Sequence, residues 1–211
     1  MSDPMTGRWI TQDPLAEKYL SVSPYVLCGN NPILRIDPDG QKWVDANGNS
    51  VWENGKWTQY ATPQIQELGN VLKSTITGQQ QFEKLINNPA NIQVTINDTD
   101  KPHIYGHMNP KGGVIFNKET GKYRINSDAE IVIYKLNAED RANKSQGLLT
   151  HLEAMAVNLG HEIEHTTDEN IELNANNASK TERERKPDAI SQKLKREYEM
   201  QKPIITDEKI F

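Results

Sequence analysis

The stretch Gly160-His161-Glu162-Ile163-Glu164-His165 constrains this chain more than any other, because it reads H-E-x-x-H. On an α-helix, residues i and i+4 share a face, so His161 and His165 can direct both imidazoles at one point. Two neutral imidazoles at this spacing are typical of the first half of a zinc site, and Glu162 beside them is a candidate general base. The motif therefore predicts a helix that carries a zinc-dependent hydrolase site, with peptidase activity as the favoured chemistry.

The residues around the motif predict one helix from Gly147 to about Thr166. An apolar stripe runs along it, and the two histidines lie on nearly the opposite face, above small or apolar residues. A helix of this kind is expected to be buried, and burial suits a metal site because the surroundings fix the ligands and exclude stray water. The stripe consists of Leu148, Leu152, Met155, Leu159 and Ile163, and the residues below the histidines are Thr150, Ala154 and Val157.

A catalytic zinc needs a third protein ligand and an open position for water. No H-x-x-G-x-x-H pattern follows, so the candidates for this ligand are acidic residues after Ser179. Glu184 is the favoured ligand, since it follows His165 by 19 residues (184 minus 165), which allows a loop and a second helix beside the first. Glu182 has a competing role, because Ser179 and Glu182 form an S-x-x-E capping box. Glu182 and Asp188 remain open as alternatives.

The predicted reaction is hydrolysis of a peptide bond by a water that Zn²⁺ activates, with the ion held by His161, His165 and Glu184. Glu162 would take the proton from this water as general base and pass it to the leaving amine. The expected cofactor is therefore Zn²⁺, and the expected substrate is a protein or peptide.

Composition favours a folded chain and excludes several classes of function. The 211 residues suffice for one core and a smaller appended segment, and mean hydropathy is −0.76. A formal net charge of −5 argues against strong nonspecific binding to nucleic acid. Cys28 is the single cysteine, so neither an intrachain disulfide nor a zinc ribbon is possible. The chain shows no membrane-spanning run and no signal-peptide pattern, so we expect any secretion to follow a signal-peptide-independent route.

Residues 41–146 alternate helical and strand patterns, which predicts the body of a mixed α+β domain. Asn-Gly turns predict one or two hairpins, on which Trp43, Trp52 and Trp57 form a small aromatic core. Two helices are expected, one beginning at Pro63 and one ending before Pro89. Strands are predicted at 92–96, 103–107, 113–116, 122–125 and 129–134. Within the second of these, His103 and His107 are interpreted as scattered surface histidines.

Residues 1–40 contain many turn-forming pairs between short β-prone pieces, and they are too few to hold a core alone. Four motifs stand out: Asp3-Pro-Met-Thr-Gly-Arg-Trp-Ile, Gln12-Asp-Pro-Leu, Ser23-Pro-Tyr and Asn30-Asn-Pro-Ile-Leu-Arg-Ile-Asp-Pro-Asp-Gly. Together these motifs resemble the end of the core region of RHS-repeat (rearrangement hotspot) proteins.

The resemblance implies that residues 1–40 are the C-terminal tail of an RHS core, which completes a large β-strand shell. Residues 41–211 would then be a variable toxin domain, released in competition between bacteria to act in the target cell. In that family a P-x-x-x-x-D-P-x-G element supports self-cleavage, and Pro32 to Gly40 fits it, although Gln41 stands where the family often has leucine. A toxin also implies a cognate immunity protein, expected to cover the cleft over the zinc. Turn formation is the alternative role for Asp37 and Asp39.

The segment Glu184-Arg-Lys-Pro-Asp-Ala-Ile-Ser-Gln-Lys-Leu-Lys-Arg-Glu resembles the second motif of zincin-type peptidase toxins, E-x-x-A-x-x-x-E-N-x-I-R-x-E. Glu184 matches the metal ligand of that motif, whereas Pro187, Ser191 and Gln192 depart from it. The resemblance implies an α+β, zincin-like metallopeptidase domain with a β-rich block, the H-E-x-x-H helix and a second C-terminal helix. Two alternatives stay open: a toxin of another chemistry, such as a nuclease or deaminase with a structural ion, and a non-enzymatic binding module.

Overall fold

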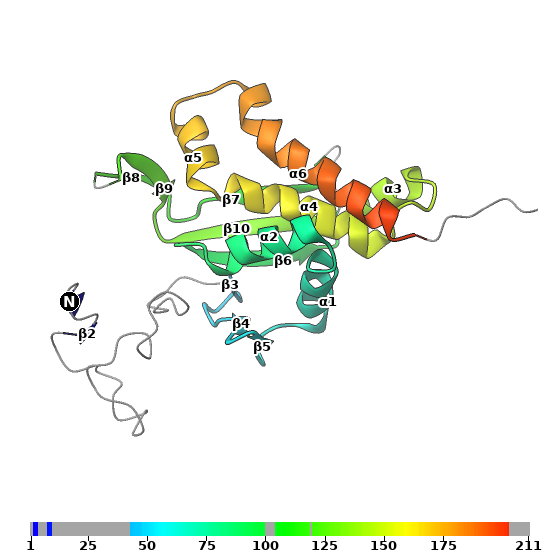
Figure 1. Cartoon of the computed structure of the whole chain (residues 1–211), viewed down its shortest axis with the longest axis horizontal. Coiled ribbons are helices and arrows are strands. Elements are labelled where there is room, and N and C mark those ends of the chain that lie inside the picture. The colour runs from blue at the N-terminus through cyan, green and yellow to red at the C-terminus, as the bar shows by residue number, and fades with distance from the viewer. Residues whose placement is uncertain (1, 4–7, 10–42, 100–103, 119, 203–211) are drawn as a thin grey trace, which may run out of the picture. The chain divides into compact units, whose positions relative to one another are not determined.

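The computed structural model describes residues 2–3, 8–9, 43–99, 104–118 and 120–202 (Figure 1). The chain divides into two compact units, residues 1–40 and 41–211. In the first unit, strand β1 (Ser2–Asp3) pairs antiparallel with β2 (Arg8–Trp9). The motifs between residues 12 and 40 lie outside the described residues, so the RHS interpretation of this unit stays a prediction.

A four-stranded mixed sheet, in the order β3-β6-β10-β7, forms the frame of the second unit. Strands β3 (Trp43–Val44) and β10 (Asp128–Tyr134) both run parallel to β6 (Asn91–Asn97). Strand β7 (Gly106–Asn109) pairs antiparallel with β10 and forms one edge of the sheet. The backbone N–H and C=O groups on the outer side of β7 therefore have no neighbouring strand among the described residues.

Two hairpins complete the β structure in the described residues of the second unit, and the first contains the predicted aromatic core. Strands β4 (Trp52–Glu53) and β5 (Lys56–Trp57) are joined by Asn54 and Gly55, whose φ angles of 50° and 77° are those that a tight Asn-Gly turn requires. The turn places Trp52 opposite Trp57, with ring centroids 4.7 Å apart. Trp43 packs edge-on to Trp57, and Phe82 joins them, so the predicted aromatic core is confirmed. The second hairpin pairs β8 (Val114–Asn117) with β9 (Lys122–Ile125).

The helices give the unit its mixed α+β class, as predicted. Five of the helices begin after a serine or threonine whose side chain accepts a backbone N–H of the first turn, which satisfies a donor that the helix cannot. None of the helices within the described residues combines the length and apolar character needed to cross a membrane. The helices are α1 (Pro63–Leu72), α2 (Ile76–Ile86), α3 (Lys135–Lys144), α4 (His151–His165), α5 (Asp168–Ala175) and α6 (Lys180–Met200).

Helix α4, which carries the H-E-x-x-H motif, lies at the centre of this unit (Figure 1). It packs against strands β10 and β7, and helices α1, α2, α3 and α6 surround it. Ten of its 15 residues are buried, as the prediction of a buried helix requires. Helix α6 approaches closely at Gly160, where a Cβ atom would lie 2.4 Å from Cδ1 of Leu194. The glycine before the motif is therefore the residue that allows the two helices to meet.

Several predicted boundaries were wrong, each for a local reason. Helix α4 starts at His151 and not at Gly147, because Thr150 and Glu153 form a capping box at its N-terminus. Leu148 precedes the helix and is 46% exposed, so it does not belong to the apolar stripe. The expected loop between the two motif helices contains helix α5, and helix α3 was also not predicted.

The predicted strand at residues 103–107 is displaced in the structure, since β7 begins at Gly106. His103 lies outside the described residues. His107 is half-buried in β7 and is not a scattered surface histidine, because its ring stacks on Tyr134 and its Nδ1 lies 3.2 Å from the Tyr134 hydroxyl. The pair joins the edge strand to the end of β10.

Candidate metal centre

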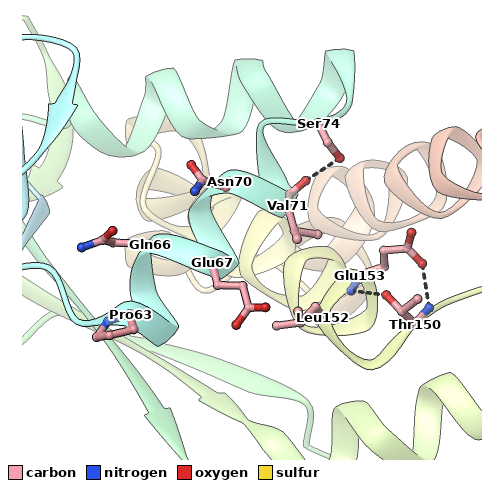
Figure 2. Close-up of a pocket in the computed structure, with 9 residues that line it drawn as sticks. All are labelled: Pro63, Gln66, Glu67, Asn70, Val71, Ser74, Thr150, Leu152 and Glu153. Atoms are coloured by element: carbon pink, nitrogen blue, oxygen red, sulfur yellow. Dashed lines mark hydrogen bonds between the residues drawn. The ribbon is translucent and has the colours of Figure 1, made fainter.

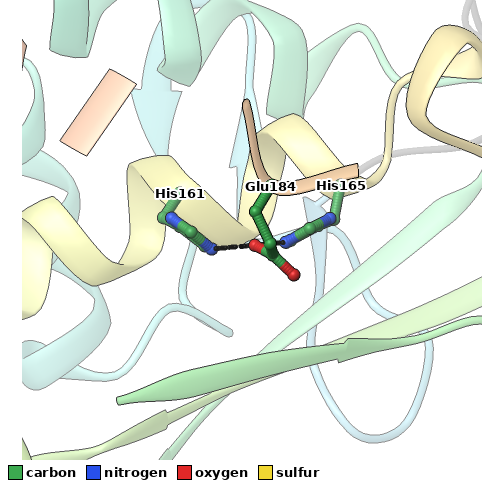
Figure 3. Close-up of side chains that lie close together, drawn as sticks. All are labelled: His161, His165 and Glu184. Carbon is green, nitrogen blue, oxygen red and sulfur yellow. Dashed lines mark hydrogen bonds and ion pairs between the residues drawn. The ribbon is translucent and has the colours of Figure 1, made fainter. Parts of the chain in front are cut away.

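Three side chains from two helices converge on one point (Figure 3). His161 and His165 extend from α4, and their Nε2 atoms lie 3.3 Å apart. Glu184 extends from α6 and places its Oε2 atom 3.2 Å from the His161 Nε2 and 3.3 Å from the His165 Nε2. The three side chains are 19%, 14% and 29% exposed, so the cluster can be reached from solvent. The group could hold a metal ion.

Hydrogen bonds behind the two imidazoles fix their orientation. His165 Nδ1 lies 2.8 Å from the side-chain oxygen of Asn170, on α5. The other atom of that amide, Nδ2, donates to the backbone carbonyl of Arg183, so it is the oxygen that faces the histidine. This contact requires a proton on the His165 Nδ1, so in the neutral imidazole the lone pair is on Nε2, where it can bind a metal ion. On the other side, His161 Nδ1 lies 3.2 Å from the hydroxyl of Ser191 on α6.

The electrostatic surroundings keep His161 neutral. Burial is the largest cause that lowers the pKa of His161, and the neighbouring His165 lowers it further, against the opposite effect of Glu184. A neutral imidazole offers a lone pair and an imidazolium does not, so a lowered pKa favours metal binding at neutral pH. The cluster thus consists of the neutral imidazole of His161, the imidazole of His165, which Asn170 orients, and the carboxylate of Glu184.

Glu162 lies beside the cluster and is nearly completely buried, with 6% of its surface exposed. Burial, and then the negative charge of Glu184, raise the pKa of Glu162 to about 8. The backbone N–H of Met108, in β7, donates a hydrogen bond to the Glu162 carboxylate and acts in the opposite direction. A carboxyl group with a raised pKa in a site of this kind can both take and release a proton near neutral pH.

The edge strand β7 contacts Glu162 at a second position. A Cβ atom at Gly106 would lie 2.9 Å from the Cγ atom of Glu162 and 3.0 Å from the carbonyl oxygen of Val132. The absence of a side chain at Gly106 therefore lets β7 lie directly against the glutamate. Together with the hydrogen bond from Met108, this contact sets the position of the candidate base relative to the edge of the sheet.

The structure separates the three acidic residues that the sequence left as candidates for the third ligand. Glu182 forms the capping box of α6 with Ser179, as predicted, and its Oε2 accepts from the Ser179 backbone N–H at 3.0 Å. Asp188 is 61% exposed, and its Oδ1 lies 3.7 Å from Nδ1 of His161, on the side of the ring away from the cluster. Only Glu184 among the three places a carboxylate oxygen beside both Nε2 atoms.

Sequence reasoning did not identify Asn170 or Ser191 as members of the site. Asn170 lies on a short helix whose start is marked by Thr167, which accepts a hydrogen bond from the Asn170 backbone N–H. That cap was readable from the sequence, but the contact of Asn170 with His165 depends on how α5 folds back. Ser191 was noted only as a departure from the zincin-toxin motif, although it occupies the position that faces His161.

An open pocket lies at the other end of α4, beside α1 (Figure 2). It shares no residue with the cluster around His161. Leu152 in the pocket and Glu162 are ten residues apart on the helix, which corresponds to about 15 Å. The residues that line it are Pro63, Gln66, Glu67, Asn70, Val71, Ser74, Thr150, Leu152 and Glu153, none of which belongs to the metal-binding group.

A comparison with known proteins finds similarity over a short segment of this chain. No family model matches the chain, and no solved structure matches it significantly. A curated protein of Aedes aegypti, named salivary gland surface protein 1, is 37% identical over 71 residues. This similarity covers 26% of the present chain and 2% of that protein, so the chain spans a very small part of its relative.

Proposed function

We propose that residues 41–211 form a zinc-dependent peptidase in which His161, His165 and Glu184 hold the ion. The mutual spacing of the three donor atoms is the observation that carries the proposal. Tetrahedral zinc with ligand bonds of about 2.0–2.1 Å separates its ligands by about 3.3 Å, since the edge of a tetrahedron is about 1.6 times the bond length. The separations here are 3.2, 3.3 and 3.3 Å. Three ligands leave the fourth position open, which is the arrangement of catalytic sites.

Zinc bound at this site supplies a Lewis acid and lowers the pKa of a coordinated water. The residues of the chain then perform two tasks. Asn170 and Ser191 hold the imidazole rings in place, and Glu162 takes the proton from the attacking water and delivers it to the leaving amine. A dication bound by Glu184 would offset the negative charge that raises the pKa of Glu162, and so would favour the ionised base.

The arrangement of helix and sheet supports a zincin-like domain and a peptide as substrate. The candidate base, Glu162, contacts the antiparallel edge strand β7 at Gly106 and Met108. An extended peptide can add to an exposed sheet edge through its main chain, because the unpaired groups of the edge strand accept it as a further strand. A peptide bound in this way would pass beside both the base and the metal ligands.

We further propose that this domain is a toxin delivered at the end of an RHS protein. The support is the series of motifs in residues 1–40, of which the last is Asn30 to Gly40. In this proposal the RHS shell of the parent protein encloses the domain, and a cognate immunity protein neutralises it in the producing cell. The peptidase would act inside the target cell.

Metal content tests the proposal directly. Protein purified without chelator should contain about one zinc per chain, and the ion should be lost in His161→Ala and in Glu184→Ala. Two matched controls remove a histidine of α4 and a glutamate of α6 that lie outside the cluster. His151→Ala and Glu182→Ala should both retain the ion, since neither residue belongs to the metal-binding group. Wild-type protein that stays free of zinc after the ion is added back would contradict the proposal.

A further inference from the structure

Arg141, on α3, is a largely buried cation that lacks a carboxylate partner. Burial lowers its pKa, and no carboxylate within residues 43–99, 104–118 and 120–202 lies within 4.0 Å of its guanidinium. Tyr105 and then Asp188 oppose this lowering of the pKa, and the Asp188 side chain is 61% exposed on α6. Burial of a charge is unfavourable unless an opposite charge or hydrogen bonds compensate it, so this guanidinium is suited to an anion that arrives from outside.

Two neighbours hold the guanidinium in one orientation. Its Nη1 donates to the side-chain oxygen of Asn158 at 2.6 Å, and its Cζ atom lies 4.1 Å from the ring centroid of Tyr105. Asn158 is only 2% exposed, and its Nδ2 has no hydrogen-bond partner in the described part of the chain. A planar guanidinium fixed on an aromatic ring keeps its remaining N–H groups in a fork, which is the geometry that binds a carboxylate with two hydrogen bonds.

Helix geometry places the Arg141 guanidinium on the His161 side of the metal cluster. Asn158 precedes His161 by three residues on α4, so the two share one face of the helix. Side chains of a helix lean towards its N-terminus, so we expect the His161 ring to extend over the turn of α4 that contains Asn158, the hydrogen-bond partner of Arg141.

We infer that Arg141, stacked on Tyr105 and bonded to Asn158, binds a carboxylate of the substrate on the His161 side of the cluster. This inference rests on the proposed peptidase function, and it names the class of substrate: a peptide with a carboxylate close to the bond that is cleaved. That carboxylate is either the free C-terminus or an acidic side chain, because both present the same planar anion. If Arg141 served only to join α3 to α4, its substitution would not change the affinity of the chain for acidic peptides relative to neutral ones.

Binding of three short peptides to the metal-free chain tests the inference. Without the ion, the peptide carboxylate cannot bind to the metal centre instead of to Arg141. The probes are N-acetyl-trialanine as the free acid, the same peptide as its carboxamide, and the carboxamide with glutamate at the middle position. We expect at least one acidic probe to bind about tenfold tighter than the neutral one, because a charge-assisted pair adds to its affinity. The tighter of the two acidic probes identifies the source of the carboxylate.

The variant Arg141→Gln should abolish the preference for the acidic probes, and Arg141→Lys should keep part of it, since lysine retains the charge without the fork. The matched control is Lys144→Gln, which removes an exposed cation of the same helix and should leave the preference unchanged. Equal binding of all three probes to wild type, or a preference that survives in a folded Arg141→Gln protein, would overturn the inference.

Zinc content of the same proteins separates this inference from the proposed function. A chain that binds zinc but shows no preference among the probes would contradict the role of Arg141 alone. A chain that binds no zinc and keeps an Arg141-dependent preference would contradict the peptidase and leave the anion site in place.

Discussion

Glutamate carboxylates have different roles at the two ends of helix α4. At its N-terminus, Glu153 accepts from the backbone N–H of Thr150 and forms an ion pair with Lys202, at 2.7 Å. At its C-terminal end, the Glu184 carboxylate faces the Nε2 atoms of His161 and His165. Within the described residues, no lysine or arginine forms an ion pair with Glu184.

This difference separates stability from function along one helix. At the N-terminal end, Glu153 is paired with Thr150 and Lys202. Removal of these interactions should lower the free energy of unfolding and leave the metal affinity unchanged. At the C-terminal end, the cluster residues His161, His165 and Glu184 face one another without a lysine or arginine partner among the described residues, so they are arranged for a ligand and not for the stability of the chain. Variants at each end can test this separation.

The largest effect is expected from Glu162→Gln, which keeps the shape of the candidate base and removes its proton transfer. Turnover of a peptide substrate should fall by about 10² to 10⁴-fold. Zinc content should stay at the wild-type level, since Glu162 is not one of the three donors. Kinetics and metal analysis on the same preparation check both statements. Turnover equal to that of wild type would rule out Glu162 as the base.

Asn170→Ala should weaken zinc binding by about 10 to 100-fold, because it removes the oxygen that orients His165. Competition with a chelator of known affinity measures this change. Asn170→Asp keeps an oxygen at the same position and should restore most of the affinity, whereas Ser179→Ala, at the cap of α6, should have no effect on it. Unchanged affinity in Asn170→Ala would show that the packing of α4 alone orients the ring.

Gly160→Ala tests how closely α6 must approach α4 to deliver Glu184. The added Cβ would lie 2.4 Å from Cδ1 of Leu194, and overpacking of this kind costs about 1–3 kcal/mol, against a gain of up to about 1 kcal/mol in helix propensity. We expect a net loss of stability in denaturant unfolding and weaker zinc binding. The double variant Gly160→Ala/Leu194→Val should cost less than the sum of the two single variants. Strict additivity would contradict a direct clash.

The parts of the fold that the sequence predicted depend on local signals. The Asn54-Gly55 turn between two tryptophans, the helix that begins at Pro63 and the capping box of Ser179 and Glu182 each involve a few neighbouring residues. The spacing of the two histidines was sufficient to predict that they share a face. Each of these features is decided within one turn or one hairpin, so periodicity and cap residues identify it.

The parts that escaped prediction depend on contacts between distant segments. Asn170 reaches His165 only because α5 folds back on α4, and Arg141 reaches Asn158 only because α3 packs beside it. The sequence favoured Glu184 but left Glu182 and Asp188 as alternatives, because the face of α6 that packs on α4 at Gly160 decides among the three. Neither composition nor spacing carries this information, because it arises from packing in three dimensions.

The smallest effect is expected at the N-terminal end of α4, from Glu153→Gln. Burial raises the pKa of Glu153, but Lys202 and Thr150 outweigh it, so that the pKa lies below its ordinary value of 4.5. A carboxyl group with a depressed folded pKa adds stability above its unfolded pKa and loses it as pH falls through the folded value. The variant should therefore cost about 0.5–2 kcal/mol at pH 7. Its unfolding free energy should converge with that of wild type as the pH falls below about 4.

Zinc affinity of Glu153→Gln measured at pH 7 should equal that of wild type, since the ion pair lies about 15 Å from the cluster along the helix. A change in affinity would mean that the two ends of α4 are coupled.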